Sequence, residues 1–354
     1  ELACRLERGL PLLTSGQRGG RHRTLRDAIG WSHDLCSPAE RSVWARLSLF
    51  AGPFTMSAAE ELCADVQDAG QVMPTVVRLV DKSVIVRIDP VDAPADGTSG
   101  GSTTRYRMLG IIREFGTELL DASGGALGIR RRFVARYLAM AREFRDHFLD
   151  DDQVARLHEM HREHANLIAA LDYAFGQGDA DGVELATVLS VYWHARGLAR
   201  EGARWLAAAA DRAPEGSPAR GHAVVERGFL LFKLGDAPGA LACAARAIEL
   251  AAQRDDEALA ARGYLVKAAA LCGTCLLTAA GEATAEARSL LCALDDRQGL
   301  ATLETQLTYL ALLDGNTEAA LGHVERGQRQ LGGSRERWLH GNLYMLASLA
   351  LYLA

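Results

Sequence analysis

Hydrophobic residues recur at three- and four-residue steps along most of the chain, which is the spacing of amphipathic helices. The first such pattern covers residues 24–35. Ser37-Pro38-Ala39-Glu40 then combines a capping box with proline at the first helical position, so a second helix is expected to begin there. Ser57 with Glu60 repeats the capping-box spacing and predicts a third helix. Residues 72–82 predict a fourth, with a buried side made of Val76, Val77, Leu79 and Val80.

The period then changes from 3.6 to 2, which indicates strands. Residues 83–89 (SVIVRID) and residues 104–109 (TRYRML) alternate and are separated by a Pro- and Gly-rich stretch. Residues 111–121 return to the helical period. This order of helices, a hairpin and a helix predicts a winged-helix domain, in which the stretch between the strands is the tip of the wing.

Beyond residues 123–125 (SGG) every pattern is helical, and a repeat appears. Gly235-Asp236, Gly281-Glu282 and Gly315-Asn316 are predicted to be turns that join two helices of a pair. First helices of the pairs are expected to begin near Ala219, Ala258, Gly299 and Arg335. A period of about forty residues is typical of tetratricopeptide-like arrays, in which each unit buries its faces against its neighbours.

The predicted fold class is therefore mainly α. We expect an end of an upstream region and a linker in residues 1–23 and a winged-helix domain in residues 24–122. A helical connector and the start of the array follow in residues 126–215, and tetratricopeptide-like repeats in residues 216–354.

Composition narrows the setting of this fold. The chain has 354 residues, 49% of them hydrophobic, a net charge of -6 and 7 cysteines without the spacing of a disulfide framework. No apolar run has the length of a membrane span. A cytoplasmic protein without membrane contact is expected. The chain opens on Glu1 and stops within a helical pattern, so we expect a fragment of a longer protein.

The sequence contains no P-loop, the motif that binds nucleotide phosphates. That motif needs glycines followed by Lys-Ser or Lys-Thr, and the only such dipeptide is Lys82-Ser83, which Asp81 precedes. No catalytic residue, cofactor-binding residue or enzyme activity is predicted for residues 1–354.

Two clusters have the residue types of metal or redox sites. His158, His161 and His164 lie in HEMHREH, but Arg162 stands where the zinc motif HExxH needs its second histidine, and a solvated polar face is the favoured interpretation. Cys272 and Cys275 have redox spacing but follow a helical pattern rather than a strand, so buried thiols are favoured. No metal site is predicted.

A winged helix could bind DNA directly. Between Ser57 and Lys82 only Arg78 and Lys82 are basic, against five acidic residues, and a net-negative surface repels the duplex. A protein-facing winged helix is therefore favoured.

An aromatic and basic cluster is the remaining candidate site. Trp193, His194, Arg196 and Trp205 are predicted to contact a ligand or partner on the repeat array. The alternative is that Trp193 and Trp205 hold the first helices of the array together, since both stand at apolar-periodic positions.

Several stretches together resemble the LuxR-type members of the bacterial STAND (NB-ARC-like) signal-transduction ATPases. RHRTLRDAIGWSHDLCSPAERSVWARLSLFAGPFTMSAAEELC is similar to their winged helix, and LVDKSVIV with RYRMLGIIREFGTELL to the signature that follows it. REHANLIAALDYAF and VYWHARGLAREGARWLAAA resemble the start of their sensor array. The resemblance covers most of residues 1–215, and Arg107 and Arg113 lie on the matching signature.

The resemblance implies an upstream domain that binds ATP or ADP and a downstream helix-turn-helix that binds DNA. It also implies that residues 1–354 relay and sense, binding an inducer or a protein partner through the repeats, with possible ligand-dependent self-assembly. GLPLL (residues 9–13) is a coincidental match to a nucleotide-domain motif. Two alternatives stay open: a scaffold that binds a protein without switching, and the same module attached to a cyclase or kinase output domain.

Overall fold

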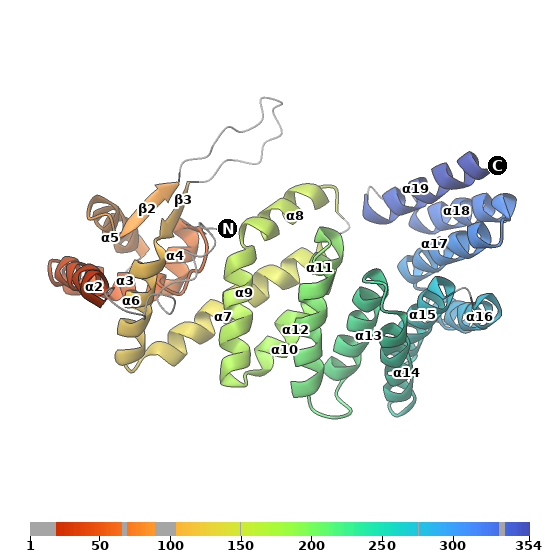
Figure 1. The fold of residues 1–354 in the computed structure, drawn as a ribbon, viewed down its shortest axis with the longest axis horizontal. Helices are drawn as coiled ribbons and strands as arrows, with labels where there is room; N and C mark the ends of the chain where they lie inside the picture. Colours follow the sequence, from red (N-terminus) through yellow and green to blue (C-terminus); the bar gives the residue numbers. More distant parts are fainter. Residues whose placement is uncertain (1–18, 66–68, 89–103, 149, 275, 333–336) are drawn as a thin grey trace. The chain divides into compact units, whose positions relative to one another are not determined.

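The computed structural model describes residues 19–65, 69–88, 104–148, 150–274, 276–332 and 337–354, and these residues are mainly helical with one small antiparallel sheet. They form two compact units (Figure 1). Unit 1 contains residues up to Tyr137 together with residues 161–174. Unit 2 contains residues 138–160 together with residues 175–354. The helices predicted from the 3.6-residue period are confirmed.

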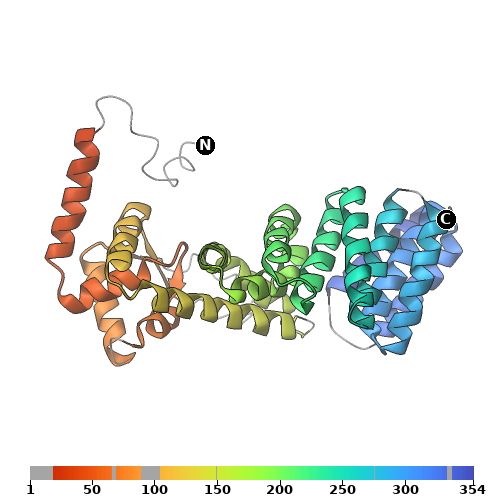
Figure 2. The same cartoon turned by 90° about the horizontal axis from the view of Figure 1, so that it is seen from below.

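Unit 1 consists of helices around a short sheet. Its helices are α2 (Gly19–Asp34), α3 (Pro38–Leu47), α4 (Met56–Cys63), α5 (Ala69–Asp81), α6 (Gly110–Ala122), the first part of α7 (Ala126–Asp146) and most of α9 (His164–Gln177). Figure 2 shows α2 standing out from the other helices of this unit.

The sheet has the order β1-β3-β2, and both pairs are antiparallel. Strands β2 (Ile85–Ile88) and β3 (Arg105–Met108) confirm the predicted hairpin. Strand β1 (Phe54–Thr55) was not predicted, because two residues are too short to show an alternating pattern. The predicted wing tip and the GLPLL stretch lie outside the described residues.

Of the two capping boxes predicted at helix starts in unit 1, the structure contains one and not the other. The predicted capping box is confirmed at α3, where Ser37 accepts from the Glu40 amide and Glu40 accepts from the Ser37 amide. The prediction for α4 was wrong: its N-cap is Thr55, which accepts from the Ala58 amide at 3.2 Å. Both hydroxyls lie at this helix end, and only the one outside the first turn can reach its free amides.

Aromatic side chains form much of the core of unit 1. Trp44 is buried and donates its indole N–H to the carbonyl of Ile112 at 3.2 Å, which joins α3 to α6. A Cβ atom on Gly116 would lie 2.9 Å from the Trp44 ring, so α6 can approach Trp44 closely only with glycine there. Phe50 stacks on Phe54 and meets Phe133 edge-on.

Unit 2 is an array of helix pairs. It begins with the end of α7 and α8 (Gln153–Arg162), followed by α10 (Ala180–Val188), α11 (Ser190–Arg196) and α12 (Ala199–Arg212). The first helices of the later pairs are α13 (Pro218–Lys233), α15 (Glu257–Gly273), α17 (Arg297–Leu313) and α19 (Trp338–Leu353). The second helices are α14 (Ala237–Ala252), α16 (Leu277–Ala293) and α18 (Thr317–Leu331). Figure 2 shows α13 to α18 stacked side by side.

The turns of the array repeat every twenty residues. The amides of residues 236, 256, 276, 296 and 316 each donate to the carbonyl five residues earlier, at 2.8 to 3.1 Å. The residue before four of these amides has a positive φ: Gly235, Asp255, Asp295 and Gly315. Such left-handed residues end helices and satisfy their last carbonyls. The predicted forty-residue period is therefore confirmed: each repeat consists of two helices, and each helix with its turn takes twenty residues.

The predicted turn at Gly281-Glu282 was wrong. Both residues lie inside α16, whose preceding turn comes before Leu276. An isolated glycine weakens a helix by about 1 kcal/mol and does not end it when the flanking residues pack well.

No helix of the described residues is long and apolar enough to cross a membrane.

Candidate functional site

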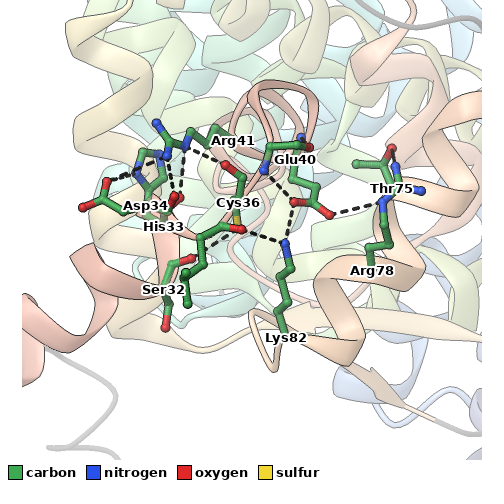
Figure 3. Close-up of polar contacts among 11 residues, drawn as sticks. Ser32, His33, Asp34, Cys36, Glu40, Arg41, Thr75, Arg78 and Lys82 are labelled. Carbon is green, nitrogen blue, oxygen red and sulfur yellow. Dashed lines mark hydrogen bonds and ion pairs between the residues drawn. The ribbon is translucent and has the colours of Figure 1, made fainter.

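The first candidate site is a charged cluster around Glu40 in unit 1 (Figure 3). Glu40 is buried, and its carboxylate accepts from Arg78 of α5 at 3.2 Å and from Lys82, which directly follows α5, at 2.6 Å. Burial by itself would raise the pKa of Glu40, but the hydrogen bonds from Lys82 and Ser37 outweigh it and lower the pKa below 4.5. The carboxylate therefore stays ionised and ties α3 to α5.

Lys82, together with Arg41 of α3, also binds backbone carbonyls at the end of α2. Lys82 also donates to the carbonyl of Leu35, and Arg41 donates to the carbonyls of His33, Asp34 and Cys36. Cations near a helix C-terminus satisfy its unpaired carbonyls and its negative dipole end. Lys82, directly after α5, therefore contacts both Glu40 of α3 and the backbone just beyond α2.

The outward face of α5 is apolar. Met73 is 54% exposed and Val77 is 44% exposed, whereas Val72, Val76 and Leu79 are buried. The sequence placed Val77 on the buried side, and this was wrong: the helix is buried along residues 72, 76 and 79, and Val77 lies on the other side. The exposed surface of α5 thus carries these apolar side chains beside Arg78, whose guanidinium pairs with Glu40 and stays about half exposed.

Sequence reasoning missed Glu163, a buried carboxylate in the HEMHREH stretch. It forms an ion pair with Arg105 of β3, accepts from the Tyr137 hydroxyl at 2.8 Å and accepts from the Asn166 amide at 2.8 Å. Asn166 in turn accepts from the Gly52 amide at 2.8 Å. Burial and the neighbouring Glu163 raise the pKa of Tyr137 well above 10.

No local signal could have shown this role, because the partners of Glu163 come from positions up to 58 residues away. The interpretation of the stretch as a solvated face fails at Glu163. Helix α8 ends at Arg162 and α9 begins at His164, so the three histidines do not share one helix. Among the described residues no group of three or more His, Cys, Asp or Glu side chains is placed to bind a metal ion.

The predicted cluster of Trp193, His194, Arg196 and Trp205 lies in unit 2 on α11 and α12. Trp193 is fully buried and contacts Tyr192, with ring centroids 5.3 Å apart, and Trp205 lies against Phe175 at 5.4 Å. These contacts agree with the alternative interpretation from the sequence, in which Trp193 and Trp205 hold the first helices of the array together. His194 and Arg196 are only partly buried.

His194 belongs to a second charged cluster, centred on Glu226 of α13. Its Nε2 lies 3.7 Å from a carboxylate oxygen of Glu226, which also forms an ion pair with Arg262 of α15. Burial would raise the pKa of Glu226, but Arg262 and His194 outweigh it and hold the pKa at about 2. The Arg262 guanidinium and the His194 ring both contact Phe229.

Lys233 extends this cluster to the last helix of the array. Its ammonium lies 3.4 Å from the His194 carbonyl and 5.1 Å from the centroid of the Trp338 ring. Partial desolvation by the surrounding protein lowers the pKa of Lys233. The amide of Arg337, the residue before Trp338, donates to the side-chain oxygen of Gln153 at 3.1 Å. Side chains of α8, α11, α13, α15 and α19 thus meet in one region, which we call the Glu226 cluster.

Cys272 is buried in the core of the array, and burial raises its pKa to about 11. At neutral pH its sulfur is a thiol rather than the reactive thiolate. The other residue of the redox-spaced pair, Cys275, lies outside the described residues.

No model of a known protein family matches the chain. Two curated relatives, from Mycobacterium bovis and Mycobacterium tuberculosis, bear the name "Putative HTH-type transcriptional regulator". Each is 31% identical over 313 residues, which cover 84% of this chain and 34% of the relative. An "Uncharacterized protein" of Mycobacterium tuberculosis is 31% identical over 149 residues, covering 41% of this chain and 33% of its own. The chain spans about a third of the length of these relatives.

Among solved structures, the chain is similar to a STAND protein with a tetratricopeptide repeat sensor from Pyrococcus horikoshii. The TM-score is 0.46 at 14% sequence identity, and the match covers 90% of this chain and 48% of that one. Over most of its length the chain is thus similar to part of transcriptional-regulator-like proteins.

Proposed function

We propose that residues 1–354 are the relay and sensor part of a LuxR-type, STAND-like regulator of transcription, with unit 1 as its winged helix. In this function the array of unit 2 binds an inducer or a protein partner, and ATP and DNA bind to other parts of the longer protein. The similarity to transcriptional-regulator-like proteins supports the regulatory setting.

The observation that carries the sensing role is the Glu226 cluster. It brings charged and aromatic side chains from helices between residues 153 and 338 into one region, so a ligand that binds there changes the contacts of the first and last helices together. Arg262 and Lys233 keep exposed surface, and both can donate to a carboxylate or phosphate of a ligand.

The relay role rests on the Glu40 cluster and on the apolar face of α5. Phosphate contacts supply most of the affinity of DNA-binding proteins, and they need free lysine and arginine side chains. Arg78 of α5 and Lys82, which follows it, pair with Glu40, and the exposed Met73 and Val77 of α5 suit a protein surface.

A thermal-shift screen of small carboxylates, phosphates and peptides tests the sensing role. A compound that raises the melting temperature of the chain is expected to lose its effect in the double variant Lys233→Met, Arg262→Met. Exposed Arg254→Met, at a position just after α14, is the control. Compounds that stabilise wild type and double variant equally would place the ligand site elsewhere.

Fluorescence anisotropy with a labelled 30-base-pair duplex tests the relay role. The whole chain is needed, because unit 1 includes residues 161–174 as well as the N-terminal helices. No binding is expected at about 0.15 M salt. Binding that weakens steeply as salt is raised would instead assign unit 1 to DNA.

A further inference from the structure

Helix α19 is apolar on two sides. Leu339, Leu343, Leu346 and Ala350 are buried against the preceding helices of the array. On another side Tyr344 is 59% exposed, Leu351 is 65% exposed and Tyr352 is 86% exposed. Scattered exposed apolar residues are normal on proteins, but several large ones on one side of a helix mark an interaction surface.

The forty-residue period gives each residue of α19 an equivalent in the earlier first helices. A Cβ atom on Gly263 of α15 would lie 2.8 Å from Ile248 of α14. Eighty residues later, Leu343 of α19 lies 3.0 Å from the position of a Cβ atom on Gly327 of α18. Both residues therefore face the second helix of the preceding pair, so α15 and α19 stand in the same register.

In α15 the residues one step further around the helix face the second helix of its own pair. Ala268, Leu271 and Cys272 are buried against Ala280 and Ala283 of α16, with Tyr264 packed against them. In α17 the equivalent of Tyr264 is Glu304, which binds His323 and Arg326 of α18.

The equivalents in α19, eighty residues after those of α15, are Tyr344, Ser348, Leu351 and Tyr352. All four are exposed. The side of α19 that is open to solvent is thus the side that α13, α15 and α17 each use to hold a second helix.

We infer that this side of α19, Tyr344-Ser348-Leu351-Tyr352, is an interaction surface for one more helix of the second type. The occupant is the next helix of the same array, the element that the twenty-residue spacing places directly after α19. The surface continues an interface that the array already forms three times, between α13 and α14, α15 and α16, and α17 and α18.

The three second helices define the chemistry of this occupant. They carry alanine at residues 240, 280 and 320, and alanine or glycine at residues 247, 287 and 327. All six positions are buried. Small residues let the two helices of a pair approach closely, and the large side chains of the first helix then fill the contact. Tyr344 and Tyr352 are large side chains of this kind.

The test appends a copy of residues 275–294 directly after Ala354, with serine for its two cysteines, so that the copied helix stands in register with α19. Hydrogen–deuterium exchange of residues 343–353 is expected to slow at least tenfold compared with the chain without the extension. The matched control carries lysine at the two positions copied from Ala280 and Ala287. It is expected to leave exchange unchanged, because a lysine cannot enter the contact.

Two results would overturn the inference. In one, both extensions leave the exchange of α19 unchanged. In the other, light scattering finds that the unextended chain is a dimer, Tyr352→Lys makes it monomeric, and the extension gives no protection. A second copy of the chain would then be what covers this surface.

Discussion

At the scale of single residues, buried carboxylates join separate elements of the fold, and three of the four buried glutamates among the described residues show this over the longest stretches of sequence. Glu40 joins α3 to α5, Glu163 joins the start of α9 to β3, and Glu226 joins α13 to α11 and α15. Removing one partner of a buried ion pair leaves the other without compensation, and this costs more than the pair contributes in net stability. These carboxylates are therefore the residues where a conservative substitution has the largest effect.

Glu40→Gln is expected to lower the free energy of unfolding by about 2 kcal/mol, because it removes the charge that Arg78 and Lys82 neutralise. Those two cations keep some solvent contact, which limits the loss. Urea denaturation measures the change. Glu118→Gln, at an exposed ion pair with Arg26, is the control and should cost less than about 0.5 kcal/mol. Equal effects of the two variants would contradict the role of Glu40.

Glu226 predicts a pH dependence with a definite sign. Its pKa is about 2 in the folded chain, against 4.5 as the ordinary value, so folding favours the ionised form. The stability it contributes is present above pH 4.5 and is lost as the pH falls from there towards 2. The shift corresponds to about 3 kcal/mol. Wild type is expected to exceed Glu226→Gln in unfolding free energy at pH 7.

Urea unfolding from pH 7 down to about pH 3 checks this, because the difference between wild type and Glu226→Gln should shrink over the acid range. Glu215→Gln, on a carboxylate that is 80% exposed, is the control for acid effects elsewhere. A difference that stays constant from neutral to acid pH would show that the Glu226 carboxylate is not held ionised by Arg262 and His194.

At the scale of elements, the sequence predicted what depends on local pattern. The capping box at Ser37, the hairpin and the turns at Gly235 and Gly315 are all encoded within a few residues. The forty-residue period followed from the same short signals. The left-handed turns at Asp255 and Asp295 carry no glycine, and the sequence did not reveal them. What could be read from the chain was thus the order and spacing of its helices.

Contacts between elements could not be read in the same way. The partners of Glu163 and Glu226 lie on other helices and strands, so the spacing of residues near each glutamate cannot predict these ion pairs. In the predicted ligand cluster, Trp193 and Trp205 are buried packing residues, and its role in ligand binding stays a prediction. Among the four residues of that predicted cluster, His194 contacts Glu226 and so belongs to the Glu226 cluster as well.

The contact between α11 and α12 gives a prediction at this scale. A Cβ atom on Gly202 would lie 2.5 Å from the Trp193 ring and 2.7 Å from Leu230. Gly202→Ala is therefore expected to lower the free energy of unfolding by about 2 kcal/mol through overpacking. Gly281→Ala is the matched control in α16, where no atom lies within 4 Å. It should raise stability by about 0.5 to 1 kcal/mol, since alanine favours the helix.

Thermal or urea unfolding of both variants measures these changes. Opposite signs are the expected result, because the two glycines differ in surroundings and not in helical position. A stabilising Gly202→Ala would mean that α12 does not approach Trp193 as closely as the structure shows.

At the scale of the whole molecule, each of the few lysines of the chain lies near a carboxylate or an aromatic ring. Lysine occurs only at residues 82, 233 and 267. Lys82 belongs to the Glu40 cluster and Lys233 to the Glu226 cluster, and Lys267 lies 5.8 Å from the centroid of the Tyr264 ring. With a net charge of -6, the chain as a whole also repels polyphosphates.

Isothermal titration with Mg²⁺–ATP therefore tests the assignment of nucleotide binding to another part of the longer protein. Phosphate-binding loops need an ammonium free to reach the β- and γ-phosphates, and the Lys82 ammonium lies 2.6 Å from the Glu40 carboxylate. No heat of binding is expected up to about 1 mM ATP, which corresponds to a binding free energy weaker than about -4 kcal/mol. The variant Lys82→Met should give the same flat titration while lowering stability. Saturable heat that Lys82→Met abolishes would assign an ATP site to the Glu40 cluster and reverse the proposed division between sensor and motor.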